Sequence, residues 1–342
     1  MAVSAAPARY DISRPELESL LAGEPRYRVD QVWEGLYARG AGPAEMTDLP
    51  KALRATLDEA LPPGLALLAE QESDGGETVK WLWSLADGSR VETVLMRYPD
   101  RVTVCVSSQA GCGMGCVFCA TGQAGLTRNL SSGEIVEQVI RARRKAAPRR
   151  LGNVVLMGMG EPLANYASVW AAVERLHDDA GISARRITLS TVGLVPGIRR
   201  LAGERLPVNL AVSLHAANDA LRDALVPINR RYPLAVLVEA CRAYVEETGR
   251  RISFEWALIA GANDRPSDAS ELAALARPLH AHVNLIPLNP TPGYRSRGTA
   301  PSGVRAFRDR LSALGVNATI RDNRGTAIDA ACGQLAARRA GD

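Results

Sequence analysis

The stretch of sequence that decides the fold is residues 102–119, VTVCVSSQAGCGMGCVFC. Its first five residues form a short, β-branched apolar run, which predicts a buried strand. The strand leads into a loop rich in Gly and Ser, where Cys112, Cys116 and Cys119 fall within eight residues. Parallel sheets build their sites in such loops, at the carboxyl ends of the strands. We therefore expect an α/β protein with reactive side chains directly after this strand.

Downstream of this strand, short apolar runs alternate with longer amphipathic patterns. This alternation predicts a parallel sheet with helices packed outside it. Six or so units in about 220 residues fit a partial (β/α)6-type barrel better than a single doubly wound nucleotide-binding domain. The predicted strands lie at residues 102–106, 154–157, 187–189, 208–212, 252–258, 283–286 and 316–320, and the predicted helices at 131–147, 166–179, 234–248, 267–279 and 302–314.

The chain before this region divides into two smaller parts. Residues 1–65 show three helical patterns, the last of which ends at a pair of prolines, and predict a small helical accessory domain. Residues 66–100 contain two β-like runs joined by the turn signal Asp87-Gly88, which predicts a hairpin linker that extends the barrel. The barrel itself, with a C-terminal loop, is expected over residues 101–342.

The composition of the chain limits its class. Its 342 residues are 46% hydrophobic and 23% charged, with a net charge of +4. These averages exclude an intrinsically disordered chain and a collagen-like repeat. No apolar run approaches the roughly 18 residues of a membrane span, and the N-terminus lacks the features of a secretory signal. We expect a soluble, cytoplasmic protein that contacts no membrane.

The basic residues leave two interpretations open. Only three of the 41 are lysines, and arginine suits bidentate contacts with phosphate. A GC-rich genome produces the same bias. Residues 141–150 carry six basic side chains in ten, on the helix after the cysteine loop. This segment either binds phosphate or is an ordinary solvated face.

The loops that follow the predicted strands share an unusual content. All of them are rich in Gly, Asn, Ser or Pro, and all fall on the carboxyl face of a parallel barrel. The ordinary explanation is that such loops need turn residues. Because every loop also carries hydrogen-bonding or metal-binding side chains, we favour one composite site. The loops read SSQAGCGMGCVFC, GMGEPLAN, STVGLVPG, SLHAAND, AGANDRP and PLNPTPG.

The spacing of the three cysteines, C-x3-C-x2-C, favours a metal centre. Soft thiolate ligands select zinc, copper or iron–sulfur clusters. A cubane cluster held by three cysteines leaves one iron open to a substrate's own atoms. A structural zinc site needs a fourth ligand, and Cys105 is the nearby candidate. The spacing favours the cluster and leaves zinc as the alternative.

These motifs carry a resemblance. The three cysteines with Phe118 before the last resemble the radical S-adenosylmethionine (SAM) enzymes. With the further motifs, the chain resembles the dual-specificity RNA adenine-C2 methyltransferases of the RlmN/Cfr family, in order from Glu92 to Leu335. The motifs are CVSSQAGCGMGCVFCATGQAGLTRNLSSGEI, MGMGEPLANY, SLHAANDALRDALVPINRRYP, LIPLNPTPG and IDAACGQL.

The resemblance implies two cofactors and their ligands. Cys112, Cys116 and Cys119 would hold one 4Fe–4S cluster, whose open iron would bind the amino and carboxylate groups of SAM. Two SAM molecules would be used per turnover. Taken alone, Glu161 reads as a turn acid and His215 as a core histidine. The residues implied in SAM binding are Gly160, Glu161, Ser190, Ser213, Leu214, His215 and Asn289.

The resemblance also implies a role for two other thiols. Cys332 would be methylated by one SAM, and a 5′-deoxyadenosyl radical from the second would remove a hydrogen from that methyl group. The carbon would join C2 of adenine, and Cys105 would release the product through a transient disulfide with Cys332. Glu92 would accept the proton; the alternative is a solvated edge-strand glutamate. Cys241 matches no motif and is expected to be a packed core thiol.

The implied substrates are an adenine of 23S rRNA and the adenine beside the anticodon in some tRNAs. The helical domain at residues 1–65 would contribute to RNA binding. A reducing system such as flavodoxin and its reductase would supply electrons to a monomeric enzyme. Two rivals remain: a Cfr-type enzyme that methylates C8 and confers resistance to ribosome-targeting antibiotics, and a zinc-stabilised RNA-binding module without catalysis.

Overall fold

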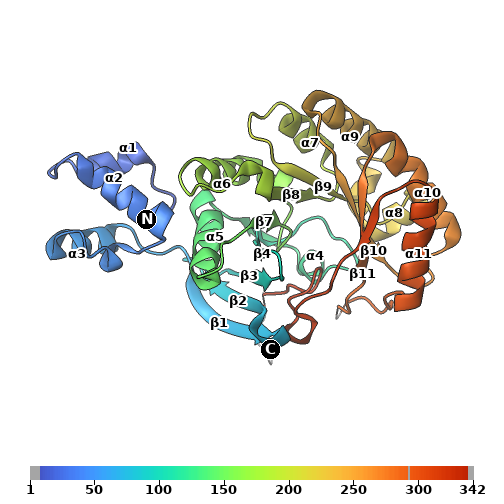
Figure 1. The fold of residues 1–342 in the computed structure, drawn as a ribbon, viewed down its shortest axis with the longest axis horizontal. Coiled ribbons are helices and arrows are strands. Elements are labelled where there is room, and N and C mark those ends of the chain that lie inside the picture. Colours follow the sequence, from blue (N-terminus) through green and yellow to red (C-terminus); the bar gives the residue numbers. More distant parts are fainter. Residues whose placement is uncertain (1–7, 292, 338–342) are drawn as a thin grey trace.

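A ten-stranded sheet, wrapped by helices on its outer face, forms the centre of the protein (Figure 1). The computed structural model describes residues 8–291 and 293–337. Residues 1–7 of the expected helical domain, Pro292 of the PLNPTPG loop and residues 338–342 lie outside the described residues. The strands follow the order β1-β2-β3-β4-β7-β8-β9-β10-β11-β12.

The sheet is antiparallel at one end and parallel over the rest. Strands β1 to β4 pair antiparallel, and from β4 to β12 every neighbour is parallel. No pairing between described residues joins β12 to β1, so the barrel is partial, as predicted. The strands are β1 (Ala66–Ser73), β2 (Thr78–Ser84), β3 (Arg90–Arg97), β4 (Val102–Cys105), β7 (Asn153–Leu156), β8 (Ile187–Thr191), β9 (Asn209–Ser213), β10 (Ser253–Leu258), β11 (His282–Pro287) and β12 (Ala318–Ile320), with β5 (Gln109–Gly111) and β6 (Leu126–Asn129) forming a separate pair.

The helices of the barrel lie outside the sheet (Figure 1). Their apolar faces pack on the strands; Trp256 of β10, for example, stacks on Phe307 of α11 at 6.1 Å between ring centroids. No helix in the described part of the chain is both long and apolar enough to span a bilayer. The helices are α1 (Arg14–Leu20), α2 (Tyr27–Glu34), α3 (Lys51–Ala60), α4 (Ala120–Ala124), α5 (Ser132–Ala146), α6 (Tyr166–Asp178), α7 (Val195–Ala202), α8 (Asp219–Leu225), α9 (Leu234–Thr248), α10 (Pro266–Ala276) and α11 (Pro301–Ala313).

The five predicted helices and the seven predicted strands of the barrel are all present, with ends shifted by a few residues. The sequence patterns did not predict α4, α7 and α8, the short pair β5 and β6, or the edge strand β1. The residues of β1, ALLAEQES, are mostly helix formers. They are extended because β2 pairs with them along their length, and tertiary pairing overrides a weak local preference.

The N-terminal helices α1 to α3 lie beside α5 and α6 (Figure 1). The Arg175 guanidinium of α6 donates to the carbonyls of Tyr10, Asp11 and Ile12. The Asp11 carboxylate in turn accepts from the Gly133 N–H at 2.6 Å, at the start of α5. The helical region therefore packs against the barrel and is held there by partly buried hydrogen bonds.

The basic segment 141–150 belongs to this same junction. Arg144 pairs with Glu45 at 2.7 Å, Lys145 pairs with Glu70 at 2.6 Å, and Arg143 donates to the Tyr37 carbonyl. These side chains join α5 to the N-terminal helices and to β1. Most of the segment thus has an intramolecular role, which neither of the two interpretations from sequence included.

The C-terminal segment, residues 321–337, crosses the opening of the sheet between β12 and the first strands. The Gly325 N–H donates to Asp74 at 3.0 Å, and Lys80 of β2 donates to the Asp329 carbonyl at 3.5 Å. Farther along, Thr121 of α4 donates to the Leu335 carbonyl at 2.6 Å. These contacts bring the segment that carries Cys332 to the carboxyl ends of the parallel strands.

Candidate active site

The three-cysteine loop joins β5 to α4, and its shape depends on glycine. Gly111 has φ of +76°, and a Cβ there would lie 2.0 Å from the Gly125 carbonyl oxygen. The Cys112 N–H donates to that same carbonyl at 2.8 Å. Cys112 and Cys116 are buried, and Cys119 is half-buried.

The three thiols of this loop lie close enough to affect one another electrostatically. Burial raises the pKa of Cys112 to about 12, and the neighbouring Cys119 adds to that shift. Burial also raises the pKa of Cys116, with further contributions from Cys119 and Cys112. A negative charge on one thiolate therefore disfavours ionisation of the others, and a bound cationic centre would offset this repulsion.

Five of the six loops predicted to form one composite site meet around a single cavity, whereas the AGANDRP loop after β10 does not line it. A cavity of about 150 Å³ at the carboxyl ends of the strands is lined by residues that follow β7, β8, β9 and β11, together with the cysteine loop and the C-terminal segment. Leu214 is fully buried behind it, and Cys112, Cys105 and Glu92 do not line it. The predicted site residues in its wall are Cys116, Cys119, Gly160, Glu161, Ser190, Ser213, His215, Asn289 and Cys332.

Glu161 presents a buried carboxylate to this cavity. One oxygen accepts from the Val192 N–H at 2.8 Å and the other from the Leu163 N–H at 3.0 Å. Burial raises its pKa to about 7, against these hydrogen bonds. A carboxylate held by two loops and short of solvent is suited to receive a ligand's ammonium group.

Two glycines before Glu161 allow the neighbouring loops to touch. A Cβ on Gly158 would lie 2.7 Å from the Val106 carbonyl oxygen, and a Cβ on Gly160 would lie 2.7 Å from the Gln109 nitrogen. Gly160 also has φ of +103°, a backbone conformation open to glycine. The glycines of the GMGEP motif thus allow the backbone of this loop to lie close to the backbone of Val106 and Gln109.

His215 lines the same cavity as the GMGEP loop, and its contacts set the protonation state of its ring. Its Nδ1 accepts from the Ala257 N–H at 3.0 Å, so the neutral ring carries its proton on Nε2. Burial lowers its pKa to about 3. The ring packs edge-on against Phe118 of the cysteine loop, with centroids 4.8 Å apart. His215 therefore offers the cavity an N–H donor at neutral pH.

Cys332 is held where the cysteine loop meets the end of β11. Asn289 donates to the Cys332 carbonyl at 3.0 Å, and the Ala120 N–H donates to the Gly333 carbonyl at 2.8 Å. A second cavity of about 80 Å³ is lined by Cys332, Cys105 and Cys119 together. The structure thus brings the two thiols of the implied disulfide to one small space, and all six cysteines are free.

Arg321 lines the same small cavity as these thiols and was not predicted from the sequence. It lines both cavities, and the nearby Cys332 raises its pKa, with smaller effects from Glu255 and Cys105. Burial raises the pKa of Cys105 to about 12, and Arg321 partly opposes that shift. The available signal was its place directly after the predicted strand 316–320.

Glu92 is buried and paired, so it is not a solvated edge-strand residue. Its carboxylate lies 3.2 Å from the Lys80 ammonium, and it accepts from the Ala336 N–H at 3.1 Å, four residues after Cys332. Burial raises its pKa, and Lys80 opposes that shift. Lys80 was also missed, although a lysine inside the apolar run TVKWLWS signals a buried partner.

Arg222 is a third site residue that no sequence pattern indicated. It is fully buried and donates to the carbonyls of Leu214, Ser213 and Val192, which fixes the loops around the cavity. Leu214 thus takes part in this network through its backbone carbonyl, which accepts from Arg222. Cys241, in contrast, is fully buried in α9, as expected for a packed core thiol.

The donor set of the loop fits an iron–sulfur cluster. Three cysteines on one short loop supply thiolate ligands, which such clusters require. A cluster takes each thiolate at a separate iron, so its ligands need not converge on one point. Within the described residues, no three His, Cys, Asp or Glu side chains form a group that could hold a single ion.

Comparison with known proteins agrees with this geometry. The family model described as the Radical SAM superfamily matches residues 106–273, the part of the chain from the cysteine loop to α10. A crystal structure of a radical SAM methyltransferase from Sphaerobacter thermophilus is 53% identical, with a TM-score of 0.93, and covers 97% of this chain and 99% of that chain. The fold and the site define a radical SAM enzyme, a class that uses a 4Fe–4S cluster and SAM.

Curated relatives narrow the class. A probable dual-specificity RNA methyltransferase RlmN from Parafrankia sp. (strain EAN1pec) is 56% identical over 349 residues, covering 96% of this chain and 91% of the relative. One of the same name from Chloroflexus aurantiacus is 54% identical, covering 96% and 92%. The chain belongs to the RlmN family of radical SAM methyltransferases. It is an enzyme, which removes the rival of a zinc-stabilised binding module.

Proposed function

We propose that this enzyme methylates C2 of a specific adenine in 23S rRNA, and of the adenine adjacent to the anticodon in some tRNAs. The observation that carries the proposal is the meeting of Cys332 with the cysteine loop around the 150 Å³ cavity. The relatives named as dual-specificity RNA methyltransferases support the choice of RNA as substrate. We place this reaction in the cytoplasm. The enzyme acts as a monomer, and a reducing system such as flavodoxin and its reductase supplies the electrons.

In this proposal, the carboxyl ends of the strands hold the cofactors. Cys112, Cys116 and Cys119 bind the cluster, and Glu161 and His215 bind SAM through the carboxylate and the Nε2–H described above. The polar and backbone groups of Gly160, Ser190, Ser213, Leu214 and Asn289 complete the SAM site. A bound cluster and SAM supply the one-electron chemistry that removes a hydrogen atom from a methyl group.

Cys332 carries the methyl group. Its thiolate takes a methyl from one SAM, which leaves as S-adenosylhomocysteine, and the second SAM serves the hydrogen removal. The methyl carbon then bonds to C2 of the adenine while still attached to the Cys332 sulfur.

Cys105 and Glu92 release the product. The Cys105 sulfur, after losing its proton, bonds to the Cys332 sulfur, and the bond between that sulfur and the carbon breaks. The released carbon takes up a proton to complete the methyl group, and the single electron left by the radical addition would return to the bound cluster. The C2 proton passes to Glu92, whose raised pKa suits a base. The shared 80 Å³ cavity supports the pairing of the two thiols. An external reductant then restores both thiols.

Anaerobic reaction with SAM, a reductant and RNA, followed by mass spectrometry of the nucleosides, tests the proposal. We expect 2-methyladenosine. Formation of 8-methyladenosine would establish the C8 rival, and neither product from enzyme with an intact cluster would refute both. Cys332→Ala should lose methyl on both protein and RNA, and Cys105→Ala should accumulate covalent protein–RNA. Cys241→Ala, at a buried thiol away from the site, is the matched control and should retain product.

A further inference from the structure

A large open cavity lies inside the partial barrel at the amino ends of the parallel strands. Its volume is about 860 Å³, within the range of ligand sites. Its wall contains no residue of the cysteine loop and none of the predicted site residues. The strand-opening residues in its wall are Asn153 of β7, Asn209 of β9, Ser253 of β10 and His282 of β11.

This amino-end cavity leads toward the cofactor cavity. Met157, Glu255 and Arg321 line both of them. On the carboxyl side, the cysteine loop is tied to the end of α8, where the Val117 N–H donates to the Leu225 carbonyl at 3.2 Å. Because these three residues line both cavities, a molecule that enters from the amino end can reach the cavity that Cys332 lines.

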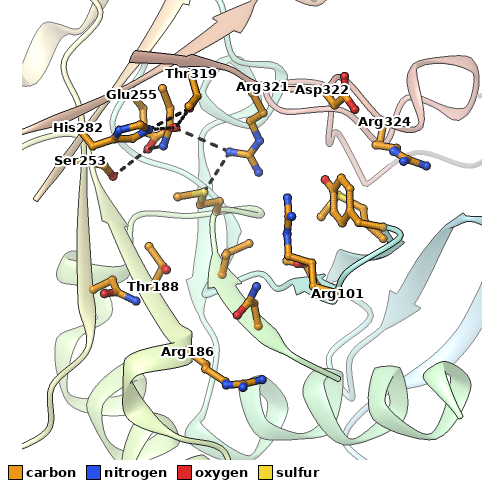
Figure 2. A pocket seen from close by; sticks show the side chains of 18 of the residues that line it. Arg101, Arg186, Thr188, Ser253, Glu255, His282, Thr319, Arg321, Asp322 and Arg324 are labelled. Carbon is orange, nitrogen blue, oxygen red and sulfur yellow. Dashed lines mark hydrogen bonds and ion pairs between the residues drawn. The ribbon is translucent and has the colours of Figure 1, made fainter. Parts of the chain in front are cut away.

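Arginine dominates the charge of the amino-end cavity. Five arginines and three carboxylates line it, and Figure 2 shows Arg101 and Arg321 directed toward one another across its open centre, with Arg186 and Arg324 at its edges. Arg101 pairs with Asp100 at 3.0 Å, but both side chains are largely exposed, and such pairs are easily replaced. The rim is thus suited to phosphate groups.

The rim also offers a surface for stacking. The Arg101 guanidinium lies 4.2 Å from the centroid of the Tyr98 ring, and the Arg324 guanidinium lies 4.9 Å from it. Unpaired RNA bases stack on such aromatic rings and guanidinium planes. A charged and aromatic rim of this kind fits single-stranded RNA.

Glu255 supplies an independent sign of a ligand. It is 2% exposed, and its Oε2 has no hydrogen-bond partner among the described residues. Its Oε1 accepts from Asn284 at 2.8 Å, whereas the Arg321 guanidinium is 3.9 Å from Oε2. A buried carboxylate oxygen needs a donor. The amino group of adenine is a donor of the right kind.

We propose that the RNA strand enters at the amino ends of the barrel strands. Arg186 and Arg251 hold phosphates that flank the target adenine, and the base passes inward until its amino group donates to Glu255. This route rests on the proposed function, because it takes an adenine of RNA as the substrate. It also requires the adenine to be out of its stack, as base-modifying enzymes generally do.

The test measures RNA binding directly. Fluorescence anisotropy with a labelled anticodon stem-loop and the cluster-loaded enzyme compares wild type, Arg186→Gln/Arg251→Gln, and the control Arg199→Gln/Arg305→Gln. The control removes the same charge from exposed positions of α7 and α11. Each phosphate contact to a single strand contributes about −0.7 to the salt slope, or about fivefold in affinity at 0.1 M salt. We expect the first pair to lose about 25-fold and about 1.4 of slope, and the control to stay near wild type.

Equal affinities for the two double variants would overturn the route, whether or not the wild type forms 2-methyladenosine. Methyl loading of Cys332 by SAM without RNA, read by protein mass spectrometry, reports whether the variants keep an intact cofactor site. Binding loss together with lost methyl loading would also overturn the route.

A second variant tests the base contact. Glu255→Gln replaces one carboxylate oxygen by a donor, so it should weaken binding of the adenine RNA about tenfold, the effect of one lost hydrogen bond to a charged group. When purine, which lacks the amino group, replaces the target adenine in the RNA, wild type and variant should bind that RNA with equal affinity. An unchanged affinity for the adenine RNA, or loss of methyl loading, would refute the contact between Glu255 and the base.

Discussion

Replacing Lys80 by Met should expose how much the fold depends on one buried ion pair. The side chains of Lys80 and Glu92 are 7% and 2% exposed, and their charged atoms lie 3.2 Å apart. Methionine keeps the length of the side chain and removes the charge. The Glu92 carboxylate would then stay buried with the backbone N–H groups of Ala336 and Ala337 as its donors.

The loss in stability should be large at neutral pH. Removing one partner of a buried pair costs about 3–5 kcal/mol, because the other charge remains desolvated. With an unfolding entropy of about 2.1 cal/mol/K per residue, the 342 residues correspond to a fall in Tm of about 4–7 °C. Thermal unfolding of the cluster-loaded protein, followed by circular dichroism, measures this shift.

The sign of the pH dependence is a sharper check. Burial raises the pKa of Glu92 above its ordinary 4.5 in the folded protein, and loss of Lys80 raises it further. A raised carboxyl pKa means that the folded state binds more protons than the unfolded state above pH 4.5, so the free energy of unfolding falls as pH rises through the folded pKa. The penalty of Lys80→Met should therefore be small near pH 4.5 and complete above the folded pKa.

The control is the double variant Lys80→Met/Glu92→Gln, which removes both charges and should recover most of the lost stability. A penalty below about 1 kcal/mol at pH 7.5, the range of an exposed pair, would refute the buried ion pair. So would a penalty that does not change between pH 5 and pH 7.5.

Three further results are expected. Gly160→Ala should abolish SAM binding in equilibrium dialysis, because its Cβ would lie 2.7 Å from neighbouring backbone. The control Gly181→Ala, at φ of +66° with open space around it, should keep SAM binding and lower the free energy of unfolding by only about 1 kcal/mol. His215 should not titrate in ¹⁵N NMR between pH 5 and 8, because its pKa in the folded protein is about 3. As pH falls below 6.5, this histidine takes up a proton in the unfolded chain but not in the folded protein, so the free energy of unfolding should decrease. Arg222→Met should cost about 3 kcal/mol or more in chemical denaturation by leaving buried carbonyls without donors, and exposed Arg199→Met less than about 0.5.

Local patterns were enough to predict the barrel and most of its elements. The helical pattern at residues 234–248 coincides with α9, and the pattern at 131–147 contains α5. Hydrophobic periodicity works for these elements because each buries one face against the sheet. It failed for β1, whose half-exposed edge position leaves no clear alternation and whose pairing with β2 decides its conformation.

The chain by itself determined the chemistry of the candidate site, because the residues that identify it are neighbours in sequence. Cys112, Cys116 and Cys119 occupy one loop, and each strand's polar loop follows that strand directly. Their meeting in one cavity follows from the parallel sheet, which gathers all carboxyl ends at one edge. This part of the site needs only local sequence and topology.

Only the tertiary structure decided which distant residues act together. Glu92 meets Lys80 across a strand pair and Ala336 from the far end of the chain. The basic segment 141–150 joins the helical region to the barrel, a use that no local pattern distinguishes from a solvated face. The amino-end cavity arises in the same way, since its arginines precede or follow different strands. Side chains far apart in sequence interact electrostatically only when the folded chain brings them close together and buries them, because electrostatic energies depend on distance and on burial.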